Sequence, residues 1–283
     1  MMRLINSNFS FSQILDECCV GITGNNSLRS RLVAGKAVLD IEGNNYVTLA
    51  IAGTLHTIAS VGVGDPVVIA NLKKSELVNL YETYFRDKDK PARAIYDVLL
   101  VSAKEKCPFC GGIGRPRNLD HYLPKAHFPQ FSVLPKNLIP SCRDCNMDGK
   151  GQGFAASADK QIIHPFLDHA DFFNEQWIFA RYTPSSTGQN DPGVVEYFVR
   201  PPVNWTNINK QRVENHFIDF DIAVRYSKEA ASELIYVEPD CNNVNLSVIG
   251  LSQLKADWQL IVNRAPFINH WKRVMYLALL DAF

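Results

Sequence analysis

Four of the seven cysteines in this 283-residue sequence are arranged as two Cys-x-x-Cys pairs. The first pair is Cys107 and Cys110, and the second is Cys142 and Cys145. A Cys-x-x-Cys turn places two thiolates on one side of a tight loop, so two such turns supply the four soft ligands of a tetrahedral zinc site. The spacing therefore predicts a structural Zn²⁺ ion bound by all four cysteines.

Two other interpretations of the cysteines are weaker. Disulfide bonds are typical of secreted proteins, and the polar stretch 1–10 does not resemble a secretory signal. A thioredoxin-like redox centre needs one Cys-x-x-Cys pair beside a βαβ pattern, which this sequence lacks. The remaining cysteines are expected to be free, reduced thiols, as is typical of a cytoplasmic protein: Cys18, Cys19 and Cys241.

The segment between the two pairs, 111–141, is longer than the loop of a simple zinc ribbon and carries a second set of polar residues. It contains Asp120-His121 and Asn137, and Asn146 directly follows the last cysteine. A carboxylate is a hard ligand that suits Mg²⁺, and an imidazole can accept a proton from water near neutral pH. Because strand neighbours point to opposite faces, this dipeptide can serve one site only at a strand end or a bulge.

Together these residues resemble the four-cysteine form of the HNH endonuclease family. The matching pattern runs over about 91–166: Cys-x-x-Cys, Asp-His with a proline three residues after the histidine, and Asn-Leu-x-Pro-x-Cys-x-x-Cys-Asn. The resemblance implies a zinc-supported, treble-clef-like ββα-metal core with His121 as general base. It also implies that Asp120 and Asn146 bind the catalytic Mg²⁺ or Mn²⁺ and that Asn137 braces the loop and orients His121. Asn146 replaces the final histidine of the family name, and its amide oxygen can still bind a metal ion.

Two other functions remain open at this point. A zinc-ribbon adaptor that binds nucleic acid or a protein without cutting would need the cysteines, but it has no need of Asp120-His121 together with Asn137 and Asn146. The other possibility is a nuclease that is held inactive until a partner ATPase from the same operon releases it. Such a protein would need both the cysteines and these polar residues. This last possibility depends on a weaker resemblance to the HNH nuclease subunits of bacterial antiphage systems such as Septu, and it implies a role in antiviral defence.

The charge of the chain is balanced, with 29 Lys and Arg against 29 Asp and Glu, which argues against an indiscriminate nucleic-acid binder. The cysteine region is locally basic, since 101–150 contains eight basic and four acidic residues. Basic residues near the expected site are candidates for binding the phosphates of nucleic acid, with DNA as the expected partner: Arg115, Arg117, Lys125, Lys136, Arg143 and Lys150. No apolar run is long enough to cross a bilayer, so we expect a cytoplasmic protein without a membrane partner.

The expected fold class is α+β and mainly helical. We predict three regions, namely a helical N-terminal region (1–90), an HNH nuclease core with the four-cysteine zinc site (91–168), and a β-hairpin followed by helices (169–283). Apolar spacing predicts helices over 77–85, 91–100, 207–236, 247–263 and 266–282. The stretch 46–56 suits either a buried strand after a turn at 43–45 or a core helix, and its alanines and length favour the helix. The hairpin is predicted over 177–182 and 194–199. The glycines of 149–153 predict that the helix after Asn146 is short.

Overall fold

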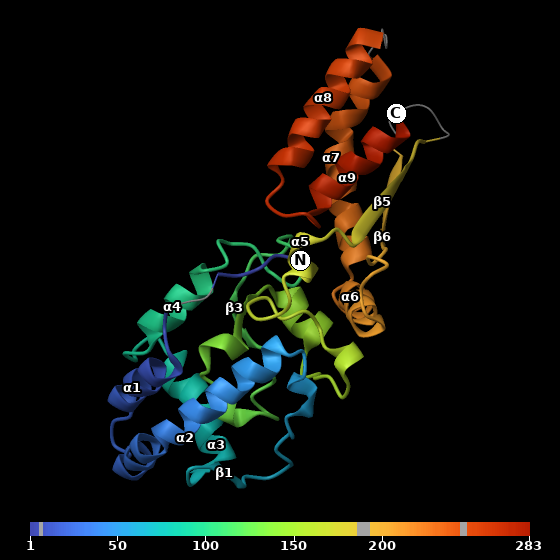
Figure 1. The fold of residues 1–283 in the computed structure, drawn as a ribbon. Helices are drawn as coiled ribbons and strands as arrows, with labels where there is room; N and C mark the ends of the chain where they lie inside the picture. The colour runs from blue at the N-terminus through green and yellow to red at the C-terminus, as the bar shows by residue number, and fades with distance from the viewer. Residues whose placement is uncertain (6–7, 186–192, 244–247) are drawn as a thin grey trace.

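The computed structural model describes residues 1–5, 8–185, 193–243 and 248–283, without the side chains of 238–243, 248 and 249. Figure 1 shows a body that contains the N-terminal helices and an elongated lobe formed by the C-terminal ones. The helices are α1 (Phe11–Gly21), α2 (Asn26–Ile51), α3 (Lys74–Asn79), α4 (Arg93–Val101), α5 (Asp171–Asn174), α6 (Asn207–Asp219), α7 (Ile222–Asn243), α8 (Val248–Arg264) and α9 (Trp271–Ala282).

The strands pair as three antiparallel two-stranded sheets within the described ranges. They are β1 (Val67–Ile69), β2 (Leu72–Lys73), β3 (Asn118–His121), β4 (Leu138–Ser141), β5 (Ile178–Thr183) and β6 (Val194–Val199). Short turns of 3₁₀ or π-helix lie between these helices and strands: η1 (Leu55–Thr57), η2 (Leu80–Phe85), η3 (Pro129–Phe131), η4 (Pro135–Asn137), η5 (Cys145–Lys150) and η6 (Ala158–Lys160). The predicted class, α+β and mainly helical, is confirmed.

The N-terminal region is helical for most of its length. Helix α1 begins at a capping box, in which the Ser10 hydroxyl accepts from the Gln13 amide and the Gln13 side chain accepts from the Ser10 amide. Helix α2 packs against α1 and ends at Ile51, because Gly53 turns the chain with a φ of 69°. The helix predicted over 46–56 is therefore right as far as Ile51 and wrong beyond it.

The hairpin β1–β2 interrupts this helical region and was not predicted. Ile69 pairs with Leu72, and the two residues between them, Ala70 and Asn71, have φ values of 51° and 57°. Two successive residues with positive φ are typical of a type I′ turn, which favours Asn-Gly rather than Ala-Asn. The usual sequence signal for this turn is therefore missing.

The helix predicted over 77–85 is present as α3 followed by the π-helical turn η2, and α4 is the helix predicted near Pro91. The turn η2 and helix α4 both contact the hairpin formed by β3 and β4. Tyr81 of η2 donates a hydrogen bond from its hydroxyl to the carbonyl oxygen of Leu119 on β3 (2.7 Å), and the Leu119 amide donates to the Tyr96 hydroxyl on α4 (3.3 Å). These bonds attach strand β3 to two elements outside the cysteine motif.

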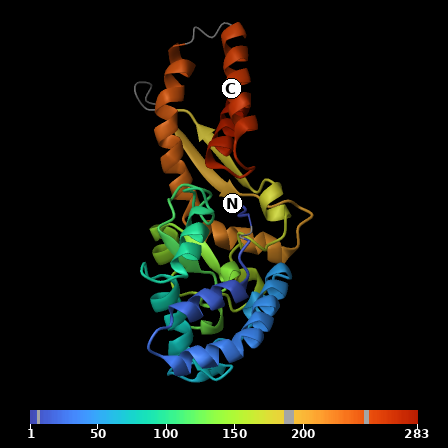
Figure 2. The ribbon, with the colours of Figure 1, turned by 90° about the vertical axis from the view of Figure 1, so that its left-hand side faces the viewer.

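The C-terminal part contains the predicted hairpin, and the helices predicted over 247–263 and 266–282 are present as α8 and α9. The helix predicted over 207–236 is wrong as a single helix, because the chain breaks into α6 and α7 at Asp221, whose φ is 48°. Strands β5 and β6 pair in register from Ile178 with Val199 to Thr183 with Val194, and α7 and α9 pack against them. Figure 2 shows the lobe extending away from the body, with α7, α8 and α9 along its length. Cys241 has no described side chain, so the prediction that it is a free thiol lies outside the described part, whereas Cys18 and Cys19 are free and buried.

The hydrophobic core runs without a break through all three predicted regions, from Met1 to Leu279. Helix α6 joins the lobe to the body, since His216 Nε2 donates to the carbonyl oxygen of Phe109 (2.8 Å) and Phe220 stacks on the ring of Phe109 at 5.0 Å. Among the described residues, no helix combines the length and the apolar character that a membrane span requires.

Candidate active site and metal centre

The four cysteines of the motif form one buried cluster. Their sulfur atoms all lie within 4.8 Å of one another, and all four are free thiols. Cys107 and Cys110 belong to the turn before β3, Cys142 follows β4, and Cys145 opens η5. Tetrahedral zinc with bonds of about 2.3 Å places its sulfur ligands about 3.8 Å apart, which this cluster reaches with small shifts. The cluster is therefore able to bind a structural zinc ion.

The turn that follows Cys110 is built from glycines for steric reasons. Gly111 has a φ of 64°, and a Cβ there would collide with the Tyr226 hydroxyl. Gly114 donates its backbone N–H to the sulfur of Cys110 (3.3 Å), and a Cβ there would collide with the sulfur of Cys142. Any larger residue at either position would push the sulfur atoms apart or displace α7.

Arg225 of α7 contacts the cluster from outside the motif. Its guanidinium lies 3.2 Å from the sulfur of Cys145 and 3.7 Å from that of Cys142, and it forms an ion pair with Asp144 at 3.5 Å. Four thiolates on Zn²⁺ carry a net charge of −2, so a cation that donates to two sulfurs stabilises the charged form. No strong sequence signal indicated this role, because Arg225 is 80 residues from Cys145 along the chain.

The hairpin β3–β4 places the acid and the base side by side. Asp120 pairs with Ile139, and His121, the last residue of β3, pairs with Leu138. Both side chains line one pocket of about 550 Å³. The dipeptide therefore lies at a strand end, which is the position that lets two adjacent residues face one site.

His121 is held as a neutral base. It is 5% exposed, and its Nε2 lies 2.8 Å from the carbonyl oxygen of Ser132. A carbonyl oxygen only accepts, so Nε2 carries the proton and Nδ1 keeps its lone pair. The Tyr81 ring packs edge-on at 4.4 Å. Burial, helped by the nearby Lys125 ammonium, lowers the pKa of His121 to about 3, so the imidazole is neutral at physiological pH.

Asp120 is buried and incompletely paired. It is 8% exposed, and its Oδ2 has no hydrogen-bond partner among the described residues. The Lys150 ammonium lies 3.6 Å from this oxygen, which is an ion pair rather than a hydrogen bond. Burial raises the pKa of Asp120 to about 6, although Lys150 opposes the shift. A buried carboxylate oxygen without a donor is costly, and a cation in the pocket would satisfy it.

The turn η5 connects the cysteine cluster to this pocket. It carries the ligand Cys145, then Asn146, and ends with Lys150, and both Asn146 and Lys150 line the pocket. Asn146 donates from Nδ2 to Oδ1 of Asn118 (3.3 Å), which leaves its own oxygen available as an acceptor or a metal ligand. The element is six residues long, so the prediction of a short helix after Asn146 is confirmed.

Asn137 lies behind the pocket and closes the loop between β3 and β4. Its Oδ1 accepts from the Leu123 amide (2.7 Å) and the Tyr46 hydroxyl (3.1 Å), and its Nδ2 donates to the carbonyls of Leu123 (3.0 Å) and Phe131 (3.1 Å). All four of its hydrogen-bonding positions are used. Phe131 is adjacent to Ser132, whose carbonyl fixes His121, so Asn137 braces the loop without touching the imidazole.

The hydrogen bond from the Tyr46 hydroxyl connects Asn137 to helix α2. Because the Tyr46 hydroxyl donates to Asn137, it accepts from Nε2–H of His164 at 3.2 Å. The tautomer is consistent, since Nδ1 of His164 accepts from the Phe166 amide (3.2 Å). Burial lowers the pKa of His164 to about 4 and keeps it neutral.

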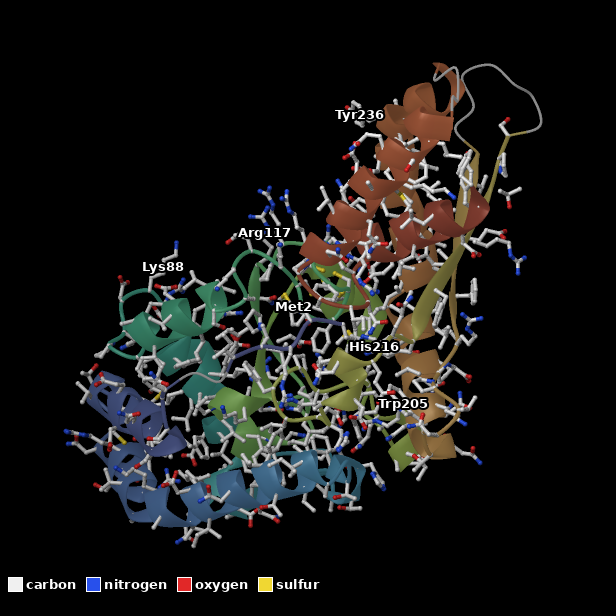
Figure 3. The ribbon with its side chains drawn as sticks, turned by 45° about the horizontal axis from the view of Figure 1, so that its top comes forward. Met2, Lys88, Arg117, Trp205, His216 and Tyr236 are labelled. Carbon is white, nitrogen blue, oxygen red and sulfur yellow. The ribbon has the colours of Figure 1, made fainter. Side chains whose placement is uncertain are left out.

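The basic residues that the sequence singled out fall into two groups. Lys125 and Lys150 line the pocket, whereas the other four do not. Arg115, Arg117 and Arg143 are exposed, and Figure 3 shows Arg117 pointing away from the body. The Lys136 ammonium lies 5.4 Å from the centre of the Phe166 ring.

Sequence reasoning missed several residues that line the pocket. Tyr81 and Arg86 come from the turn η2 and the residue after it, and the Tyr81 ring supports His121. Glu82 on the same turn forms ion pairs with Arg86 (2.7 Å) and Lys125 (3.2 Å), so it holds two cations at the rim. In the sequence, Tyr81 belongs to the apolar spacing of the helix predicted over 77–85. Arg86 begins a charged segment, 86–90, which suggests a solvated linker or a contact with nucleic acid but gives no sign of this pocket.

Comparison with curated proteins finds a relative that spans nearly the whole chain. Protein ea31 of Escherichia phage lambda is 39% identical over 286 residues, covering 96% of this chain and 95% of that protein. The Septu protein PtuB of Bacillus thuringiensis is 34% identical over 84 residues, covering 27% of this chain and 32% of PtuB. No family model and no solved structure matches the chain.

Proposed function

The chain belongs to the family of protein ea31 of Escherichia phage lambda, and for this member we propose metal-dependent hydrolysis of phosphodiester bonds in nucleic acid, with DNA as the expected substrate. The proposal is an HNH-type endonuclease with a ββα-metal core of β3, β4 and η5. One observation carries it: a neutral, buried His121 and an incompletely paired Asp120 line the same pocket at the end of a hairpin anchored by four cysteines.

The donor set of the pocket fits a hard divalent ion. Asp120 Oδ2 is a buried carboxylate oxygen without a hydrogen-bond donor among the described residues, and the amide oxygen of Asn146 is an uncharged oxygen ligand. Asp120 and Asn146 would hold Mg²⁺ or Mn²⁺, and the ion would supply positive charge for the phosphate and for the leaving 3′-oxygen. The four cysteine sulfurs are soft donors and would hold Zn²⁺ in a structural role.

The residues of the chain supply the remaining steps. His121 accepts a proton from water at Nδ1, and the water oxygen attacks phosphorus as the bond to the 3′-oxygen breaks. The Ser132 carbonyl accepts from Nε2–H, which fixes the ring and stabilises the imidazolium that forms. Lys125 and Arg86 at the rim, and Lys150 deeper in the pocket, offer positive charge to phosphate oxygens.

The test is cleavage of supercoiled plasmid by purified protein in Mg²⁺, in Mn²⁺ and in EDTA, with His121→Ala in parallel. We expect nicked or linear plasmid from the wild type in Mg²⁺ or Mn²⁺, and none in EDTA or from the variant. Cleavage by His121→Ala at the wild-type rate would contradict the assigned base. If intact protein binds plasmid without cutting it in any ion, an autonomous nuclease is ruled out, and the zinc-ribbon adaptor and a nuclease gated by a partner are the two functions left.

A second candidate function is a nuclease subunit gated by a partner ATPase. The similarity to the Septu protein PtuB favours it, together with the balanced charge of the chain. Such a protein would be an effector of antiviral defence and would cut little until its partner releases it. Co-purification from cells that express the native operon, followed by the plasmid assay with and without ATP, separates this function from an autonomous nuclease.

A further inference from the structure

A second pocket, of about 420 Å³, lies beside the candidate active site and has no role in the proposed hydrolysis. Its volume falls in the range of pockets that enclose small organic ligands. The walls come from parts of the chain far apart in sequence: Leu55 and His56 in η1, Tyr122 and Leu123 after β3, the stretches 149–150, 153–156 and 160–162, and Asp219 at the end of α6.

The two pockets share a wall. Lys150 lines both, Gly149 and Gly153 line the second pocket, and Gly151 and Gln152 line the first. The Lys150 ammonium lies 3.6 Å from Asp120 Oδ2, so the second pocket begins one side chain away from the carboxylate of the active site. A nucleotide with its phosphate at Asp120 therefore has this second pocket within reach of an adjacent base.

The lining suits a flat heteroaromatic ring. Phe154 is 42% exposed, and it is supported by Phe128 (5.0 Å, edge to face) and His127 (5.0 Å), which leaves part of its ring open. His56 lines the pocket, and its Nδ1 is buried without a hydrogen-bond partner within the described ranges. Because this nitrogen is buried, the ring must turn to present it to a ligand, and it can then donate or accept according to its tautomer.

We propose that this pocket binds one unstacked nucleobase of the substrate strand, next to the phosphate that is cut, with Phe154 stacking on the base and His56 contacting its edge. The inference rests on the proposed nuclease function and names its substrate class. A base can enter such a pocket only from a single strand or from a duplex that is locally opened, because a paired base is stacked on both faces.

The test is a binding cycle on protein that carries His121→Ala, so that the strand stays intact. The probes are a short, fluorescently labelled single-stranded DNA oligonucleotide and an abasic deoxyribose phosphate chain of the same length, and affinity is measured by anisotropy in Mg²⁺. We expect Phe154→Ala to weaken binding of the intact strand about tenfold and to leave binding of the abasic chain unchanged. Tyr236→Ala is the matched control, since Tyr236 is 77% exposed on the distant lobe (Figure 3).

A second variant, His56→Ala, tests recognition of the edge of the base. We expect its loss of affinity to differ among homopolymeric strands of the four bases and to vanish for the abasic chain. Equal losses for intact and abasic strands in both variants would overturn the base pocket, because the residues would then act only on the backbone or the fold. Thermal unfolding of each variant checks that the fold is retained.

The base pocket and the nuclease function can be tested separately. Wild-type protein is incubated in parallel with the same oligonucleotide and Mg²⁺. Cleavage together with equal affinity for intact and abasic strands overturns the pocket and leaves the nuclease standing. If the wild type neither binds nor cleaves the oligonucleotide, the base pocket is overturned, and cleavage of plasmid decides the nuclease function independently.

Discussion

The cysteine cluster and the Asp120–His121 pocket belong to the same hairpin but are built in opposite ways. The cluster brings together four soft donors whose positions are set by two local turns, and it is fully buried. The pocket brings together hard oxygen donors and a base, and one carboxylate oxygen lacks a hydrogen bond among the described residues. One part of the motif is therefore arranged for stability, and the other keeps the unsatisfied groups that chemistry needs.

The two sites are also supported by different neighbours. Arg225 of the C-terminal lobe contacts the cysteine sulfurs, whereas Tyr81 and Tyr46 of the N-terminal region support His121 and its loop. Changes in the cluster should therefore act on folding and metal content, and changes around the pocket should act on the reaction. Four substitutions test that separation, in order of decreasing effect.

Loss of one zinc ligand should be the most damaging change. Cys142→Ser is expected to give zinc-free, unfolded or insoluble protein, because structural zinc contributes about 10–16 kcal/mol, as much as the whole stability of a typical domain. Zinc content and circular dichroism measure the result. Cys19→Ser, a buried thiol outside the cluster, is the control and should keep its zinc. Soluble, zinc-free and active Cys142→Ser protein would disprove the structural role of the cysteines.

Removal of the base should abolish the reaction and spare the fold. His121→Ala is expected to lower kcat about 10²- to 10⁴-fold, the usual range for a general base, with unchanged zinc content. Single-turnover cleavage measures the rate, and His169→Ala, whose side chain is 65% exposed, is the matched control. A variant that loses its zinc together with its activity would argue against the separation of the two sites.

Neutralisation of the guanidinium beside the cysteine cluster should weaken zinc binding without touching the pocket. Arg225→Gln is expected to lower zinc affinity about 10- to 100-fold, as is typical for an outer partner of a metal ligand. Competition with a chromogenic chelator measures the affinity. Cleavage by the zinc-loaded variant should stay at the wild-type rate. A lower rate at full zinc occupancy would show that the cluster and the pocket are coupled.

Removal of the hydroxyl behind the pocket should be the mildest change. Tyr46→Phe leaves Asn137 Oδ1 and His164 Nε2 without one buried partner each, and the expected loss in the free energy of unfolding is about 1–3 kcal/mol. Urea unfolding measures it. We also expect kcat to fall with KM and zinc content unchanged, since the loop that carries Ser132 loosens. An unchanged kcat would mean that Asn137 braces the loop without help from α2.

Much of the fold was predictable where the signal is local. The hairpin β5–β6 and the C-terminal helices follow from apolar spacing and flanking turn residues. The hairpin β1–β2 was missed because its turn uses Ala70-Asn71, and the end of α2 was misplaced because the apolar pattern continues past Gly53. In both cases residues with positive φ set where the chain turns, and the pattern of apolar residues carries little information about φ.

For the site, the chemistry of the donors can be read directly from one short segment. The spacing of the cysteines and the identities of Asp120, His121 and Asn146 are local properties, so they could be found without a structure. Tertiary structure decided the environment: the burial that lowers the pKa of His121, the Asp120 oxygen that lacks a hydrogen bond among the described residues, and the contacts of Tyr46, Tyr81 and Arg225. These depend on desolvation and on groups far apart along the chain, and no local pattern encodes where such groups meet.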